Sequence, residues 1–358
     1  MKRPAYDSPS LPITWDRVKY VEGTNEYVSI RPNFLKESIE PLYAQGDSSN
    51  VQFDVREEFG ENPYELQNIL EKWVLSDLNV IPTDSIVLRI DTEAVRRSGM
   101  TIPAALGDSI PDYMHISLKG KRALYKSELM MLEMLAHANW ERPIYMAITV
   151  GTENQLNMAN HFVQEGLAYR FTPFDTKALD ATIDTEKMYD NMMNKFKYGG
   201  IDKDGIYIDE NVLRMCFTHR RIFAQLIDRL LEEGKNEMAL NALNYCEQVI
   251  PAKNVPYDYQ NGAINLARAF YKLGEKEKAD AIMDYLANKA VEFITWYLSM
   301  NDSQLMVSYR EVGYHVTLLD EEIRTMEQYE SNLAACYGAT LDTLYNEFVS
   351  RFDSKAPQ

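Results

Sequence analysis

The hydrophobic positions of Lys126–Thr149 change their spacing partway along the segment. Apolar residues recur at helical spacing in its first part, and an extended apolar run follows, so a helix leads directly into a strand. The next segment repeats this order, with Asn157–Gly166 as the helix and Leu167–Pro173 as the strand. Two successive helix–strand units predict a parallel sheet, because a helix can carry the chain back to the starting end of the sheet.

The remaining N-terminal residues form short patterns separated by turn residues. Prolines interrupt the first 55 residues, in which Lys19–Glu22 is one of only a few strand-like patches. The other predicted elements are a helix from Asn62–Pro63 to about Ser76 and strands at Glu26–Ile30, Ile86–Ile90 and His115–Leu118. Residues 1–175 are therefore expected to form an α/β domain with a small, mostly parallel sheet.

A polar segment separates this half of the chain from a helical half. Residues 176–208 are rich in Asp and Gly, a composition typical of a linker between domains. Asp209 is of a residue type that caps helix N-termini, and helical periodicity continues from it to about Phe352. We therefore predict an all-α domain at residues 209–358 and an α+β fold overall.

The helical half contains an internal repeat. Leu231–Ala239 is matched by Tyr271–Ala279, 40 positions further on, with a Gly at the same place in both copies. These positions resemble the tetratricopeptide pattern, in which Gly ends the first helix and a small Ala lets the second helix pack closely. We expect Ala239 and Ala279 at helix crossings, within a tetratricopeptide-like array of helical hairpins.

Composition restricts the classes of partner. The chain has 358 residues, 46% of them hydrophobic, and a formal net charge of -17, which repels a nucleic-acid backbone. No apolar run is long enough for a membrane span, and no signal peptide is expected at the start of the sequence. Cys216, Cys246 and Cys336 have no CxxC spacing, and we expect buried free thiols.

Residue patterns give little direct evidence of chemistry. The GxGxxG, P-loop, GxSxG and HExxH motifs are absent, and the five histidines lack metal-ligand spacing. Asp202–Gly205 resembles a calcium loop, but its Gly is misplaced and a turn before a helix cap explains the same residues. The 23 tyrosines and four tryptophans could stack on sugars, although packing explains them equally. We therefore expect no catalytic residue, no cofactor and no metal, with Thr149–Glu153 and Thr172–Asp175 as the generic ligand site of a parallel sheet.

Three strings carry a family resemblance, namely Tyr125–Ala147, Glu165–Arg170 and Gly205–Arg214. They resemble the soluble C-terminal portion of a bacterial multi-spanning membrane-protein family of formerly unknown function, related to the eukaryotic transmembrane protein O-mannosyltransferase. The resemblance covers roughly residues 1–300. It implies that the membrane-spanning, catalytic half is missing here and that the sheet is incomplete at its N-terminus. The positions that it marks as a functional or docking surface are Asn139, Trp140, Arg142, Pro143, Tyr145, Glu165, Gly166, Tyr169 and Arg170.

The resemblance implies a non-catalytic, extracytoplasmic region of a lipid-sugar-dependent protein O-glycosyltransferase at the periplasmic face of the inner membrane. Its partners would be the membrane-spanning half and an acceptor protein or peptide. One alternative is a helical-repeat interaction module without enzymatic role, which holds a peptide on residues 209–300. Another is a free-standing enzyme with a pocket near Thr149 and Thr172.

Overall fold

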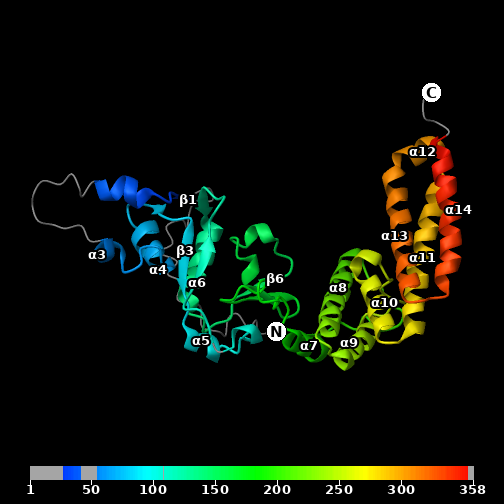
Figure 1. Ribbon diagram of the computed structural model, residues 1–358, viewed down its shortest axis with the longest axis horizontal. Helices are drawn as coiled ribbons and strands as arrows, with labels where there is room; N and C mark the ends of the chain where they lie inside the picture. The colour runs from blue at the N-terminus through cyan, green and yellow to red at the C-terminus, as the bar shows by residue number, and fades with distance from the viewer. Residues whose placement is uncertain (1–26, 42–54, 108, 354–358) are drawn as a thin grey trace, which may run out of the picture. The chain divides into compact units, whose positions relative to one another are not determined.

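The computed structural model describes residues 27–41, 55–107 and 109–353, so the predicted patch Lys19–Glu22 lies outside the described residues. Residue contacts divide the chain into two units, Met1–Asp184 and Thr185–Gln358 (Figure 1). All strands that the structure describes belong to the first unit, and the described part of the second unit is helical. A mixed α and β content is therefore confirmed.

The first unit contains small sheets and no extended parallel sheet in its described part. The strands are β1 (Tyr27–Ile30), β2 (Val80–Ile81), β3 (Ser85–Arg89), β4 (Tyr113–Ser117), β5 (Ala123–Tyr125), β6 (Tyr145–Ala147), β7 (Phe162–Gln164) and β8 (Ala168–Phe171). Their orders are β2-β1-β5, β3-β4 and β6-β8-β7. Among these strand pairs only β1 and β2 run parallel, so the prediction of a mostly parallel sheet is wrong.

The error arises in the second predicted helix–strand unit. Instead of a helix through Asn157–Gly166, the chain makes one 3-10 turn at Ala159–His161 and enters β7. It then reverses through a turn in which the Glu165 N–H and the Ala168 carbonyl lie 3.0 Å apart, and Gly166 has φ 129°. So short a connection can join only antiparallel neighbours, because a parallel pair needs a crossover. Phe162 and Val163 therefore lie in the first strand of a β-hairpin and not in a helix.

The helix–strand unit at Lys126–Thr149 is confirmed as α6 (Lys126–Ala138) followed by β6. The helix begins where the Glu128 carboxylate accepts a hydrogen bond from the Tyr125 N–H at 2.9 Å. Its buried residues Leu129, Leu132 and Leu135 belong to the hydrophobic core of the first unit. The helical spacing of these leucines is the signal from which the helix was predicted.

The predicted helix at residues 63–76 is shorter and less regular than expected. Glu65 is extended, with ψ 137°, so α4 starts at Leu66 (Leu66–Asn68) and continues as a π-helix at Ile69–Val74. Trp73 holds this segment, since its Nε1 donates to the Pro63 carbonyl at 3.2 Å and its ring stacks on Phe59. The other helical segments of this unit are Leu35–Ile39 (π), α3 (Val55–Phe59), α5 (Thr92–Arg97) and 3-10 turns at Ala104–Leu106 and Thr152–Asn154.

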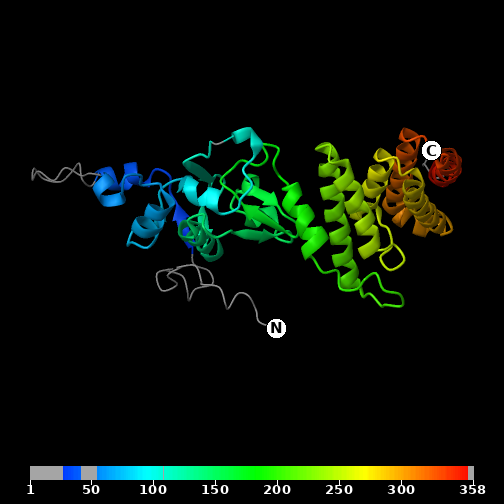
Figure 2. The same cartoon turned by 90° about the horizontal axis from the view of Figure 1, so that it is seen from below.

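The second unit stacks its helices in chain order, as Figure 2 shows from α8 onward. They are α7 (Thr185–Asp190), a π-helix at Asn191–Lys195, α8 (Glu210–Glu232), α9 (Asn236–Val249), a 3-10 turn at Tyr259–Asn261, α10 (Ala263–Lys272), α11 (Lys276–Leu298), α12 (Asp302–Val307), α13 (Tyr309–Gln328) and α14 (Leu333–Asp353). Asp209 caps α8, as predicted, and accepts a hydrogen bond from the Val212 N–H at 2.9 Å. The expected succession of helices is therefore observed.

Small residues allow these helices to approach one another. Ala239 and Ala279 are fully buried, and a Cβ placed on Gly262 would lie 3.0 Å from the Ala224 Cβ. This close packing agrees with the role expected of the small residues, while the tetratricopeptide geometry stays a prediction. Cys216 and Cys246 are buried, but Cys336 is exposed because it lies on an outward face of α14.

Candidate functional site

The turn from α6 to β6 and the β7–β8 hairpin together carry the candidate residues. Asn139, Trp140 and Arg142 lie in the turn, and Tyr145 starts β6. Antiparallel pairing places Tyr145 opposite Arg170 and Met146 opposite Tyr169. Glu165 lies in the hairpin turn. The fold therefore brings together two segments that the sequence separates, although by a different strand order than expected.

A polar network connects three of these residues, two of which are buried. The Tyr145 hydroxyl donates to Glu165 Oε2 at 2.6 Å, and Arg170 Nη1 lies 3.8 Å from Glu165 Oε1. Glu165 and Arg170 are 8% and 4% exposed, so the two charges are held largely away from water. Burial, followed by the hydrogen bond to Glu165, raises the pKa of Tyr145 to about 12. The phenol therefore keeps its proton at neutral pH and acts as a donor.

Arg170 also connects the sheet to a distant segment of the first unit. Its Nη2 donates to the Ser98 carbonyl at 2.9 Å and to Ser98 Oγ at 3.2 Å, and Nη1 donates to the Gly99 carbonyl at 3.4 Å. Both terminal nitrogens of the guanidinium therefore have acceptors within the first unit, whereas its buried Nε has no hydrogen-bond partner among the described residues. Glu165 and Arg170 are thus buried and have partners within the first unit, and their part in a docking surface stays a prediction.

Two consecutive left-handed residues shape the turn after α6. Asn139 has φ 43° and Trp140 has φ 60°, a backbone region that residues other than Gly rarely adopt. Trp140 is anchored on both sides, because its Nε1 donates to the Arg89 carbonyl at 3.1 Å and its ring stacks on Phe171 with centroids 5.5 Å apart. The ring thus attaches the turn to β3 and β8.

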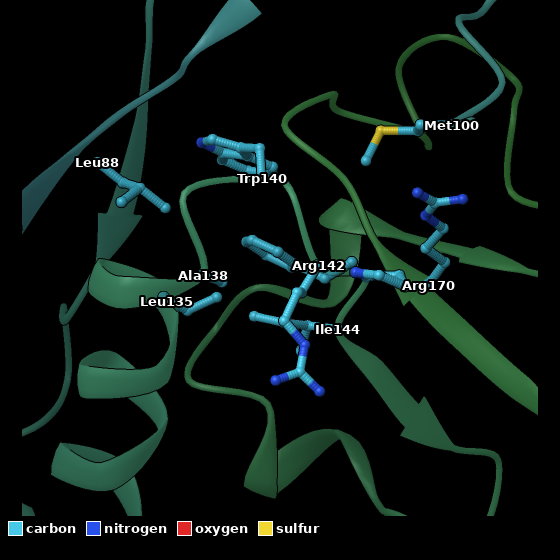
Figure 3. Close-up of a pocket in the computed structure, with 10 residues that line it drawn as sticks. Leu88, Met100, Leu135, Ala138, Trp140, Arg142, Ile144 and Arg170 are labelled. Carbon is cyan, nitrogen blue, oxygen red and sulfur yellow. The ribbon is translucent and has the colours of Figure 1, made fainter. Parts of the chain in front are cut away.

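Arg142 lies on the outside of the same turn. In Figure 3 its side chain extends away from Trp140, whereas Arg170 extends toward the segment that carries Met100. Arg142 and Asn139 are exposed, and Tyr145 is 47% exposed. These three side chains and the exposed Pro143, with the half-buried Trp140, form the accessible part of the predicted surface. Tyr169 is half-buried against the core.

The cavity next to Trp140 is too small for a substrate. It measures about 10 Å³ and is lined mainly by apolar side chains, which include Leu88, Met100 and Phe171 (Figure 3). A volume of this size holds about one water molecule. The cavity therefore provides no binding site for a sugar or a peptide.

Two open grooves lie beside it in the first unit. One, of about 680 Å³, is lined by Asn139, Trp140 and polar side chains of β3 and the segments next to it. The other, of about 780 Å³, is lined by β5, β6 and the loop that follows β6. Asn139 and Trp140 contribute to the first groove and Tyr145 to the second, so the candidate residues do not converge on one pocket.

The generic ligand site expected at the strand ends loses its basis, because it assumed a parallel sheet. Val150 and Glu153 line the second groove, but Thr172 is buried and its Oγ1 donates to the His161 and Phe174 carbonyls. The Thr172 side chain is therefore turned into the fold, whereas Asp175 is exposed. Within the described ranges, no group of three or more His, Cys, Asp or Glu side chains is placed to hold a metal ion.

Sequence reasoning did not identify Ser98, Gly99 or Arg89 as partners of the site. Arg170 is 72 positions from Ser98, and Trp140 is 51 positions from Arg89. Local periodicity carries no signal for contacts of this separation. Apart from Ser98 Oγ, the acceptors are backbone carbonyls, for which the residue type gives no indication.

Comparison with known families gives one match. The family model of TMEM260-associated domain 2 matches residues 1–191, which include every candidate site residue. No curated protein and no solved structure is significantly similar to the chain. In the part of the chain that the structure describes, no helix is both long and apolar enough to cross a bilayer.

Proposed function

The chain belongs to the family of TMEM260-associated domain 2, and on this premise we propose that it is a docking region for a TMEM260-type membrane protein. The finer form of the proposal is that this membrane protein is a lipid-sugar-dependent protein O-glycosyltransferase, and that the chain lies on its extracytoplasmic, periplasmic side. The chain contributes binding and no catalytic group. Residues 1–175 would form the docking domain, and residues 209–358 a helical-repeat domain for the acceptor protein.

The observation that carries the proposal is the extent of the family match. It covers both the turn between α6 and β6 and the β7–β8 hairpin, which carry the candidate residues. Two features of that surface support a binding role. Its charged centre, Glu165 and Arg170, is rigidly held and buried, while Asn139, Arg142 and Tyr145 are accessible around it. Exposed Arg and Tyr are the side chains that most often carry binding energy at protein interfaces.

Co-purification tests this function. The full chain is co-expressed with the TMEM260-type membrane protein of the same organism, which carries the affinity tag, and the detergent-solubilised complex is isolated. We expect the chain to co-elute and Arg142→Glu to reduce its recovery at least fivefold. The matched control is Arg97→Glu, which reverses an exposed charge on α5 and should leave recovery unchanged. Absence of co-elution for the unmodified chain, or sugar transfer by the chain alone, contradicts the proposal.

A second candidate function is a helical-repeat module that binds a peptide independently of the membrane protein. It is favoured by exposed aromatic side chains along one face of α11. Trp296 is 56% exposed and Phe293 38%, and the Lys289 ammonium lies 5.5 Å from the Phe293 ring centroid. If this function holds, Trp296→Ala should abolish capture of the partner, whereas Arg142→Glu should not. The reverse result supports docking through the first unit.

A further inference from the structure

The last two long helices form a terminal hairpin of the helical unit. α13 and α14 run antiparallel, and both pack against α11, beside which they lie in Figure 1. This is the main attachment of the hairpin, because α8 and α9 pack against each other and against α10. A terminal hairpin held through one interface exposes less surface on opening than an internal one. It is therefore the part of the array that can open while the rest stays folded.

Polar contacts connect the hairpin to its neighbours. The Arg268 guanidinium of α10 donates to Glu321 Oε1 at 3.2 Å and to Thr325 Oγ1 at 3.0 Å. The Tyr337 hydroxyl of α14 donates to Asp284 Oδ1 of α11 at 2.7 Å. The Glu321 and Asp284 carboxylates thus each have a donor from across the interface.

Glu322 is a carboxyl group of this interface that lacks such a donor. It is 1% exposed, and its Oε2 has no hydrogen-bond partner among the described residues. Burial, Glu321 and, more weakly, Glu322 raise the pKa of Tyr259, which lies in the turn before α10. Burial, Asp284 and, more weakly, Glu322 raise the pKa of Tyr337 on α14. Glu322 therefore lies between elements of the array and of the hairpin.

The described residues around Glu322 offer it no free cation. The charged and titratable groups that face it from the neighbouring elements are Glu321, Arg268, Tyr259, Asp284 and Tyr337. Arg268 is bound to Glu321 and Thr325. A buried carboxylate without a counter-charge is costly, whereas the protonated acid carries no charge. The closed hairpin therefore favours the protonated form of Glu322.

Protonation of Glu322 depends on whether the hairpin is closed. Burial, followed by the charge of Glu321, raises the pKa of Glu322 from 4.5 to about 8 in the closed hairpin. In an open hairpin the carboxyl is in water and has its ordinary pKa. The closed form is thus fully favoured below about pH 4.5, and this preference is lost as the pH rises toward 8. His315 acts in the opposite direction, because burial lowers its pKa below 6.5.

The two ends of the hairpin are held differently. Near the end of α14, Arg351 Nη2 donates to the Met300 carbonyl at 2.8 Å and pairs with Asp302 at 2.7 Å. Met300 lies between α11 and α12, and Asp302 begins α12, so this end is fastened to the connection through which the chain leaves α11. Glu322 lies toward the opposite end, in the part of α13 nearer the α13–α14 turn. This arrangement provides a hinge at one end and a titrating group near the other.

We propose that the α13–α14 hairpin is a pH-controlled flap, which is closed while Glu322 is protonated and swings open about the end fastened by Arg351 when Glu322 ionises. Opening uncovers part of the apolar surface that α13 buries, which includes Leu319, Ile323 and Met326. The flap is separate from the docking function. It makes the accessible surface of the helical unit depend on pH.

Thiol labelling of the full chain tests the flap. Thr325→Cys places a thiol at a position that is 2% exposed and faces Arg268 of α10 in the closed hairpin. Its rate of reaction with N-ethylmaleimide is measured by peptide mass spectrometry at pH 6 and pH 8. The rate is divided by that of the exposed Cys336, which corrects for thiolate formation. We expect the corrected rate to rise roughly 10- to 50-fold from pH 6 to pH 8.

Two further substitutions and a native thiol are the controls. Adding Glu322→Gln should abolish the rise, whereas adding Glu327→Gln, at an exposed position of the same helix, should leave it unchanged. Cys246 is buried in α9 and should stay unlabelled at both pH values. A constant corrected rate or a rise that persists in Glu322→Gln overturns the proposal. A parallel rise at Cys246 also overturns it, because the whole unit would then be unfolding.

Hydrogen exchange of the unmodified chain gives a second measurement, which decides the matter if Thr325→Cys does not fold. After correction for the intrinsic rates, amides on both sides of the α13–α14 turn should exchange faster at pH 8 than at pH 6. Amides of α8 and α9 should show no such change. Equal protection of the hairpin at the two pH values overturns the proposal.

Discussion

Arg220 Nη2 donates a hydrogen bond to the backbone carbonyl of Val255 at 2.7 Å, deep within the helical unit. The same guanidinium donates to the Ile250 carbonyl at 2.9 Å and to the Pro256 carbonyl at 2.8 Å, and it lies 5.1 Å from the Tyr257 ring centroid. Arg220 is fully buried. One side chain of α8 therefore holds the irregular connection between α9 and α10.

Replacing this guanidinium should be among the most damaging single changes in the helical unit. Arg220→Met keeps the side-chain bulk but leaves three carbonyls without their donor, and we expect the free energy of unfolding to fall by about 3–5 kcal/mol. Urea denaturation followed by circular dichroism measures it. The control is Arg221→Met, since Arg221 is the exposed neighbour on the same helix. Equal effects of both substitutions would show that the carbonyl contacts contribute nothing.

Two glycines allow a matched test of close helix packing. Gly262 and Gly274 have similar left-handed φ angles of 88° and 82°, but an added Cβ meets the Ala224 Cβ at 3.0 Å only at Gly262. Gly274→Ala should cost about 1–2 kcal/mol, the strain of a left-handed Ala, and Gly262→Ala about 1–3 kcal/mol more because of overpacking. The melting temperatures of the two variants give the comparison. A smaller decrease in melting temperature for Gly262→Ala than for Gly274→Ala would contradict the close approach of α8 and α10.

Glu322 makes the stability of the chain dependent on pH. It is 1% exposed, and burial, followed by the charge of Glu321, raises its pKa from 4.5 to about 8. Because the folded state holds this proton more tightly than the unfolded state, the stabilisation is complete below about pH 4.5 and is lost as the pH rises toward 8. Glu322→Gln removes the ionisation and should raise the free energy of unfolding at pH 8 by about 4 kcal/mol.

Denaturation at several pH values checks this prediction. The free energy of unfolding of Glu322→Gln should exceed that of the unmodified chain by an amount that grows from pH 5 to pH 8. Glu327→Gln, at an exposed position of the same helix, should follow the unmodified chain. A constant difference across this range would mean that Glu322 is not the group that titrates.

Tyr145→Phe isolates the hydrogen bond to Glu165. The substitution removes only the hydroxyl and leaves Glu165 and Arg170 in place. We therefore expect the free energy of unfolding to fall by about 1 kcal/mol. Spectrophotometric titration gives a second measurement. A phenol with a pKa of about 12 should be missing from the titration curve of the variant, because the ordinary value of 10 is raised by burial and by Glu165. Tyr113→Phe, at an exposed position of β4, is the stability control.

The parts of the fold that follow local periodicity were predictable from the sequence. The leucines of α6 and the cap at Asp209 gave their elements directly, and Ile86–Ile90 and His115–Leu118 match β3 and β4. The direction of the strands was not predictable in this way, since Phe162 and Val163 continue a helical pattern by spacing alone. Their position before Gly166 is the local evidence for a hairpin.

For the candidate site, the sequence indicated which residues lie near one another but not which of them are buried. The marked residues do gather on one region of the first unit, but the sequence could not distinguish buried Arg170 from exposed Arg142. That distinction depends on Ser98 and Gly99, which reach Arg170 only after the chain has folded. Residue type alone assigns the same properties to both arginines.

The turn at Asn139 and Trp140 has a strained, left-handed backbone that the contacts of the Trp140 side chain hold in place. Two residues in this backbone region cost roughly 1–2 kcal/mol each, and the contacts of the Trp140 ring with Arg89 and Phe171 offset that cost. Trp140 lines one groove, and β6, the strand that follows the turn, lines the other. Release of this ring would therefore relax the turn and alter the shape of both grooves together. The shape of the exposed surface on both sides of this turn thus depends on one half-buried residue.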